Sequence, residues 1–291
     1  MLDNNTSQNI YHILQKKFFP NLKFIDERER LVFLSYIRGF LPFLFDFNVK
    51  NVLEIGGGQS TYLLSHLASR SNFKLCTIDK NPLAIKNKLR SLSITEDVVS
   101  NINFIKGFSL STKTIKDFYK KKAIKIGNFS YFDALKNSEE FINISLDSRK
   151  KEKVISALNL KSFNSREILK SQIGKENIPY ELLKLYRTNN DELSENIDKD
   201  SDSSSCLETC IQKIKPEAIF LDGGEFTSIL EWNLVFDYQK KGDYVILHDI
   251  YFPKSIKNWL VASSIKADKH YEVLFIDKTT PQGFLVAQRI I

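Results

Sequence analysis

A glycine-rich loop with an acidic neighbour lies in the first third of the chain. The segment VLEIGGGQST places Glu54 near the end of an apolar run, before Gly56, Gly57, Gly58 and Ser60. Glycines let a backbone turn sharply and approach a ligand, and a helix that begins there offers N–H groups to an anion such as phosphate or carboxylate. Glu54 favours a cationic amino group, because a carboxylate repels a pyrophosphate. The glycines alone are also compatible with a structural turn or a nucleotide site.

Asp79 ends the next apolar run of the chain. A carboxylate at the end of a second strand can accept hydrogen bonds from both hydroxyls of a ribose. NAD would fit this residue as well as any other adenosine-containing cofactor, and the alternative is a cap for a helix that begins near Pro82. With the loop before it, Asp79 predicts an adenosine-binding site.

Polar residues end two later apolar runs, with Asp222 in IFLDGG and the pair His248 and Asp249 in VILHDI. In an open parallel sheet the carboxyl ends of the strands face the ligand crevice. We therefore expect Asp222 and His248 near the cofactor, where either could move a proton. The alternative for both is a hydrogen-bonded strand end without chemistry.

The elements that must position these residues alternate along the chain. Short β-branched runs and helical patterns follow one another from residue 50, which is typical of parallel strands joined by crossover helices. Strands are predicted over 51–55, 74–78, 102–105, 218–221, 244–247, 271–276 and 284–287, and helices over about 61–69, 82–92, 227–239 and 255–265. The last two strands flank the turn-forming DKTTPQG, which predicts a hairpin that nicotinamide-type sheets do not usually have. The predicted fold is α/β, a Rossmann-like doubly wound sheet, mostly parallel with a C-terminal antiparallel hairpin, plus a largely helical insertion.

The chain divides into three predicted parts. Residues 1–48 form N-terminal helices, 49–109 and 213–291 form the core, and 110–212 form an insertion in which the alternation is lost. So long a segment without a repeating pattern is typical of a lid or a small subdomain. The apolar stretch 31–47 is predicted to be a buried helix, because it carries Arg38 and Pro42 and is shorter than a membrane span.

Charge is unevenly distributed over the 291 residues. The net charge is +7, and residues 113–187 hold 17 Lys and Arg against 9 Asp and Glu, whereas 191–208 hold 1 against 7. A basic segment beside an acidic one favours a solvated, self-compensating face over a nucleic-acid surface. Three cysteines and the absence of a secretory signal pattern favour a reducing cytoplasm.

The glycine loop resembles the first motif of the class I S-adenosylmethionine-dependent methyltransferases, an acid followed by three alternate glycines. It stands here as Glu54, Gly56, Gly58 and Ser60, with serine in place of the last glycine. The segment 218–250 is similar to a branch of small-molecule O-methyltransferases with an Asp-Gly segment after strand four and a His-Asp pair after strand five. The resemblance covers about residues 50–108 and 216–288.

This resemblance implies S-adenosylmethionine as the cofactor. The residues that would bind it are Glu54, Gly56, Gly57, Gly58, Ser60, Asp79, Ser109 and Asp222. Some members of the branch also hold Mg²⁺, which implies Asp222 and Asp249 as metal ligands and His248, with Asp222, as the catalytic residues. The family's Asp-Gly-Asp-His stands here as Asp222, Gly223, Gly224 and Glu225, so metal dependence is left open.

The expected reaction is methyl transfer to an oxygen of a small molecule, a sugar or a secondary metabolite. The alternatives are a nucleic-acid methyltransferase, an aminopropyltransferase of the polyamine type, a non-catalytic cofactor-binding protein and a nicotinamide oxidoreductase. The expected partner is a small-molecule substrate, with no nucleic acid and no membrane span, and homo-oligomerisation is left open.

Overall fold

The computed structural model describes residues 27–40, 49–71, 73–92, 94–119, 125–130, 133, 202, 205–224, 227–251, 257–277, 280 and 282–291. Residues 1–26 of the predicted N-terminal helices, and 134–201 of the predicted insertion, lie outside this set. The predicted division into three parts therefore stays a prediction.

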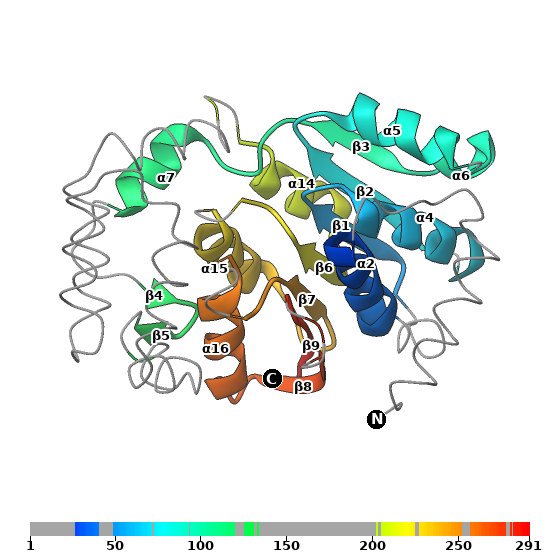
Figure 1. Cartoon of the computed structure of the whole chain (residues 1–291). Helices are drawn as coiled ribbons and strands as arrows, with labels where there is room; N and C mark the ends of the chain where they lie inside the picture. Colours follow the sequence, from blue (N-terminus) through cyan, green and yellow to red (C-terminus); the bar gives the residue numbers. More distant parts are fainter. Residues whose placement is uncertain are drawn as a thin grey trace, which may run out of the picture.

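Seven strands form one twisted sheet in the order β3-β2-β1-β6-β7-β9-β8 (Figure 1). They are β1 (Asn51–Ile55), β2 (Lys74–Asp79), β3 (Asn103–Lys106), β6 (Ala218–Leu221), β7 (Tyr244–His248), β8 (Tyr271–Asp277) and β9 (Phe284–Arg289). The first five are parallel, whereas β9 runs antiparallel to both β7 and β8. The predicted fold class is confirmed, including the C-terminal hairpin, and each predicted strand is present within two residues of its expected ends.

Helices cover both faces of the sheet, because the side chains of a strand alternate between its faces. One face packs against α2 (Glu27–Phe40), α4 (Gln59–Ser71), α5 (Pro82–Ser91) and α6 (Glu96–Ser100), and the other against α7 (Thr112–Tyr119), α14 (Leu207–Ile214), α15 (Ser228–Tyr238) and α16 (Trp259–Ala267). In β1, Val52 belongs to the first core, and Leu53 and Ile55 belong to the second. Burial of both faces explains why the strands read as continuous apolar runs.

Helix α2 packs against the antiparallel end of the sheet through aromatic rings. Tyr36 and Phe40 contact Phe220 on β6 and Phe284 on β9, with ring centroids 5.3 to 6.4 Å apart. Gly39 makes this approach possible, because a Cβ there would lie 2.1 Å from the Phe284 ring. The buried helix predicted over 31–47 is present over 31–40, and residues 41–47 lie outside the described set.

The structure adds elements that the sequence pattern did not indicate. Helices α6, α7 and α14 are short, and β4 (Lys125–Ile126) pairs with β5 (Phe129–Ser130) in a small hairpin. The Asn233 side chain on α15 holds this hairpin, because its Oδ1 accepts from Gly127 N at 2.8 Å and its Nδ2 donates to Lys125 O at 3.0 Å. The described beginning of the predicted insertion is thus attached to the core.

Two further observations bear on the sequence predictions. Cys76, Cys206 and Cys210 are free thiols, and Cys76 and Cys210 are buried in the core. Among the described helices, none combines the length and the apolar character needed to cross a membrane.

We predict that Gly39→Ala destabilises the protein. In an unobstructed helix this change stabilises by up to about 1 kcal/mol, but the added methyl overlaps the Phe284 ring, and overpacking costs about 1–3 kcal/mol. Urea unfolding measures the effect. Gly58→Ala is the control, because a Cβ there meets no atom within 4 Å; a Gly39→Ala variant as stable as the natural chain would contradict this packing.

Candidate active site

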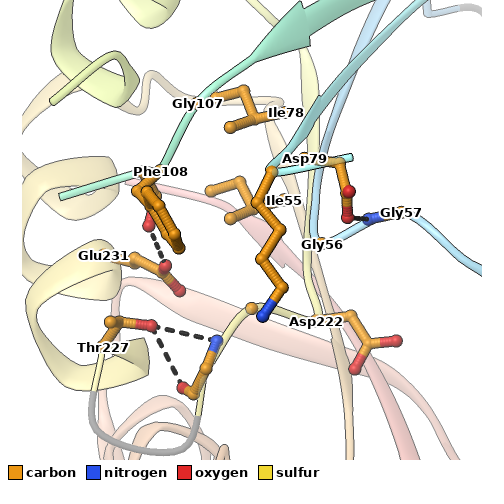
Figure 2. Close-up of a pocket in the computed structure, with 14 residues that line it drawn as sticks. Ile55, Gly56, Gly57, Ile78, Asp79, Gly107, Phe108, Asp222, Thr227 and Glu231 are labelled. Carbon is orange, nitrogen blue, oxygen red and sulfur yellow. Dashed lines mark hydrogen bonds between the residues drawn. The ribbon is translucent and has the colours of Figure 1, made fainter. Parts of the chain in front are cut away.

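A cavity of about 220 Å³ lies at the carboxyl edge of the sheet. Its walls come from the segments that follow β1, β2, β3 and β6 and from the start of α15. Figure 2 shows Phe108, Glu231 and Thr227 along one side and Gly57, Asp79 and Asp222 along the other. The described residues that line it are Ile55, Gly56, Gly57, Ile78, Asp79, Lys80, Gly107, Phe108, Ser109, Asp222, Gly223, Gly224, Thr227 and Glu231. The structure thus brings together four predicted cofactor residues besides Asp222, namely Gly56, Gly57, Asp79 and Ser109.

The glycine loop uses its own N–H groups internally. Gly56 N donates to Ile78 O at 3.0 Å, Gly57 N to Asp79 Oδ2 at 3.1 Å, and Gly58 N to Thr61 Oγ1 at 2.9 Å. Three groups that a phosphate would need are therefore already satisfied. The expectation that the loop offers them to an anion is corrected at these positions.

Gly56 is required by a close approach of two loops. It adopts φ +85, and a Cβ would lie 2.3 Å from the carbonyl oxygen of Asp222. Asp222 N in turn donates to Ile55 O at 2.9 Å, so the chain segments after β1 and β6 are in direct contact. Gly58 has open space around it and does not line the cavity.

The expected direct contact of Glu54 with a ligand is wrong for this structure. Glu54 has no exposed surface, and its carboxylate accepts hydrogen bonds from Ser60 Oγ at 2.6 Å and from Thr61 Oγ1 and Thr77 Oγ1 at 2.8 Å. Neither Glu54 nor Ser60 lines the cavity. Their side chains join β1, β2 and the first turn of α4, so they hold the loop rather than the ligand. Burial raises the pKa of Glu54 to about 7, although the three hydroxyls oppose that rise.

Asp79 lies where the sequence predicted it, at the cavity wall. Its Oδ2 accepts from Gly57 N and its Oδ1 from Asn81 N at 2.6 Å. The alternative role as a helix cap belongs to another residue, because Asn81 caps α5 through a bond from Ala84 N at 3.3 Å. Each oxygen of Asp79 keeps a second lone pair that could accept from a ligand hydroxyl.

Ser109 forms a polar pair with Glu231 across the cavity from Asp79. Ser109 Oγ donates to Glu231 Oε1 (Figure 2). Glu231 is fully buried on α15, and it lies so close to Gly223 that a Cβ there would be 2.7 Å from Oε1. Glu231 was not among the residues predicted from the sequence, because an acid in the first turn of a helix is common at the surface.

Most of the charged side chains that line the cavity are acidic. Among the described residues of the lining, Asp79, Asp222 and Glu231 supply three carboxylates, and Lys80 supplies one ammonium group. Such a lining attracts a cation and repels a phosphate.

A buried charged cluster lies behind the Asp222 wall. Lys257 Nζ forms an ion pair with Asp222 Oδ1, and Tyr36 Oη donates to Asp222 Oδ2 at 2.7 Å. Burial works to raise the pKa of Asp222, but Lys257 and then His248 outweigh it and hold that pKa well below its ordinary value. Burial works to lower the pKa of Lys257, whereas Asp222 and Asp249 raise it above the ordinary lysine value. The Tyr36 pKa lies well above its usual range, first through burial and then through Asp222.

His248 belongs to this cluster and does not line the cavity. It is 2% exposed, and its ring lies 4.4 Å from the ring of Tyr36. Because Ser35 Oγ donates to Val32 O at 2.7 Å, the Nε2–H of His248 donates to Ser35 Oγ at 3.0 Å. Its Nδ1 lies 3.5 Å from Asp222 Oδ1. A general base must reach the hydroxyl proton of the acceptor. Protein groups surround both nitrogens of His248, so the predicted base does not have that access in this structure.

Asp249 follows β7 in the left-handed region, with φ +59. This turn directs its Oδ2 to 3.6 Å from both His248 Nδ1 and Lys257 Nζ. One ligand atom each from Asp222, His248 and Asp249 lies within 4.8 Å of the others, so the two predicted metal ligands are brought together.

Besides Glu231, sequence reasoning missed Tyr36, Lys257 and Asn258. Tyr36 is one of many aromatic residues on a buried helix, and Lys257 follows a strand end in a lysine-containing loop. Asn258 Nδ2 donates to Leu221 O at 2.8 Å and to His248 O at 2.7 Å, and so joins the ends of β6 and β7. No periodicity marks these residues, since each acts across the tertiary structure.

The chain is similar to solved structures of other proteins over nearly its whole length. No protein-family model and no curated protein matches the chain. Among solved structures, it is similar to an O-methyltransferase from Bacillus cereus in complex with SAH, at 11% identity and a TM-score of 0.36, over 99% of this chain and 92% of that one. It is also similar to a protein from Klebsiella pneumoniae, provisionally called an O-methyltransferase, at 12% identity and a TM-score of 0.37, over 100% and 92%.

We predict that Glu54→Gln changes how stability depends on pH. A carboxyl whose pKa rises from 4.5 to about 7 on folding stabilises the native state at low pH, and that contribution is lost as the pH rises from about 4.5 to about 7. The free energy of unfolding of the variant should therefore gain about 3 kcal/mol on the natural chain between pH of about 4 and pH of about 8. Urea unfolding of both proteins at the two pH values measures this; a difference that does not vary with pH would contradict the buried, neutral carboxyl.

Proposed function

We propose that this chain is an S-adenosylmethionine-dependent methyltransferase that methylates an oxygen of a small molecule. The acidic cavity lining is the observation that carries the proposal. A ligand with an ammonium group and a sulfonium suits three carboxylates and one lysine, whereas the pyrophosphate of NAD does not. The internally bonded glycine loop supports the same choice, because Gly56, Gly57 and Gly58 keep their N–H groups for protein acceptors.

The lining suggests how the cofactor would lie. Asp79 would accept hydrogen bonds from the ribose hydroxyls, and the Ser109–Glu231 pair would accept one from the amino group of the adenine. The amino-acid end would then extend along Gly56 and Gly57 towards Asp222. A cavity of about 220 Å³ is smaller than the roughly 300–1,000 Å³ usual for ligand pockets, so such a ligand would project from it towards the acceptor.

The bound cofactor would supply a methyl group already activated by the positive sulfur. Asp222 would accept a hydrogen bond from the acceptor hydroxyl at the cavity wall. Lys257, which keeps its proton, would stabilise the negative charge that develops on the acceptor oxygen. His248, whose Nδ1 lies 3.5 Å from Asp222 Oδ1, would keep the Asp222 carboxylate in position. His248 does not line the cavity, so we propose acceptors whose hydroxyl ionises readily, such as phenols, and loses its proton to solvent before the methyl group is transferred.

We predict that isothermal titration will detect S-adenosylmethionine and S-adenosylhomocysteine binding but no NAD binding. Asp79→Asn should weaken the binding of both adenosyl ligands roughly 10–100-fold, because a charge-assisted hydrogen bond contributes about 1.5–3 kcal/mol. The amide retains an oxygen for Gly57 N, whereas its NH2 group cannot accept from Asn81 N, so urea unfolding of the variant should accompany the titration. Asp97→Asn on α6 is a matched control, because Asp97 is exposed and does not line the cavity.

The reaction itself is tested by the release of S-adenosylhomocysteine in the presence of small phenols. Lys257→Met should lower turnover more than it lowers cofactor affinity, because the lysine contacts the wall at which the acceptor would bind. NAD binding in place of the adenosyl ligands would refute the proposal.

A further inference from the structure

The acidic cluster behind the cavity matches the predicted metal site only in its spacing. The ligand atoms of Asp222, His248 and Asp249 lie within 4.8 Å of one another, which is close enough to surround one cation. Mg²⁺ is the ion that the sequence resemblance implies. It prefers six oxygen ligands in a nearly regular octahedron and keeps several waters.

The side chains present do not fit that ion. Both oxygens of Asp222 already have a protein partner, since Oδ1 pairs with Lys257 Nζ and Oδ2 accepts from Tyr36 Oη. The positive charge of the Lys257 ammonium group repels a second cation at this carboxylate. The third member of the cluster offers an imidazole nitrogen, which Mg²⁺ does not favour. Only Asp249, with 22% of its side chain exposed, retains much contact with solvent.

A cation is nevertheless present in the cluster, and it belongs to the chain. Lys257 Nζ contacts Asp222 Oδ1 and lies 3.6 Å from Asp249 Oδ2, so it stands between the two carboxylates that would hold the metal. Only 13% of the lysine side chain and 9% of the Asp222 side chain are exposed. Two carboxylates buried this close together need a positive charge, and the ammonium group supplies it.

The side chain of the next residue, Asn258, fixes the chain at the lysine. Its Nδ2 donates to Leu221 O and His248 O, the carbonyls just before Asp222 and Asp249. The left-handed turn at Asp249 directs its carboxylate back towards the same point. The ammonium group and both carboxylates are therefore held by one set of hydrogen bonds at the ends of β6 and β7.

We propose that the Lys257 ammonium group permanently occupies the cation position between Asp222 and Asp249, so that the chain uses its own side chain where a divalent ion would otherwise bind. The cluster is thus a metal-independent electrostatic site. This inference goes beyond methyl transfer and does not depend on it, because it concerns which cation the cluster holds.

Binding of Mn²⁺ tests the inference in the absence of any cofactor or acceptor. The natural chain should not bind the ion at this cluster. Lys257→Ala leaves two carboxylates and an imidazole around a vacant position, and it should bind Mn²⁺ at least about tenfold more tightly than the natural chain. Adding Asp249→Asn to this variant should abolish the gain. Lys88→Ala is the matched control, because Lys88 is an exposed lysine on α5.

The natural chain provides a second measurement should Lys257→Ala fail to fold. A ligand that binds the native state raises the unfolding midpoint. The midpoint should therefore be the same in EDTA and in millimolar Mg²⁺ or Mn²⁺. A metal-dependent rise that Asp249→Asn removes would overturn the inference, as would a folded Lys257→Ala protein with no gain in Mn²⁺ affinity. Neither result would affect the adenosyl-ligand titrations, so the two proposals fail separately.

Discussion

The ion pair between Lys257 and Asp222 is the interaction on which the candidate site depends. Both side chains are largely buried at the carboxyl edge of the sheet, and two charges leave water there only if each is compensated. The compensation comes from separate parts of the chain, with Tyr36 from α2, His248 and Asp249 from the end of β7, and Lys257 from the turn before α16. The cluster therefore joins both faces of the sheet at the edge where a ligand would bind.

The polar groups of the glycine loop are likewise paired within the protein. Its three glycine N–H groups and the Glu54 carboxylate are all bonded to protein groups. A loop built in this way presents its backbone shape to a ligand and leaves the charge of the cavity to Asp79, Asp222 and Glu231. Selection of a cationic ligand is then a property of the whole lining and not of the acid within the motif.

The sequence predicted the core elements well because the signal was local. Parallel strands buried on both faces read as apolar runs, and the hairpin of β8 and β9 is separated by turn-forming residues. Positions at the ends of those runs predicted Asp79 and Asp222 at the cavity. The expected roles of Glu54, Ser60 and His248 depend on where each side chain points, which a sequence pattern does not give. In the structure all three side chains point to protein partners.

By itself, the sequence determined the doubly wound sheet, its antiparallel end and the edge at which a ligand would lie, because hydrophobic periodicity and strand ends are properties of neighbouring residues. Only the tertiary structure decided which polar groups face that ligand and which are buried against one another. Tyr36 reaches Asp222 across 186 residues and Lys257 reaches it across 35. No local sequence pattern predicts these contacts with Asp222. They form because α2 and the segment before α16 pack against the same strand end.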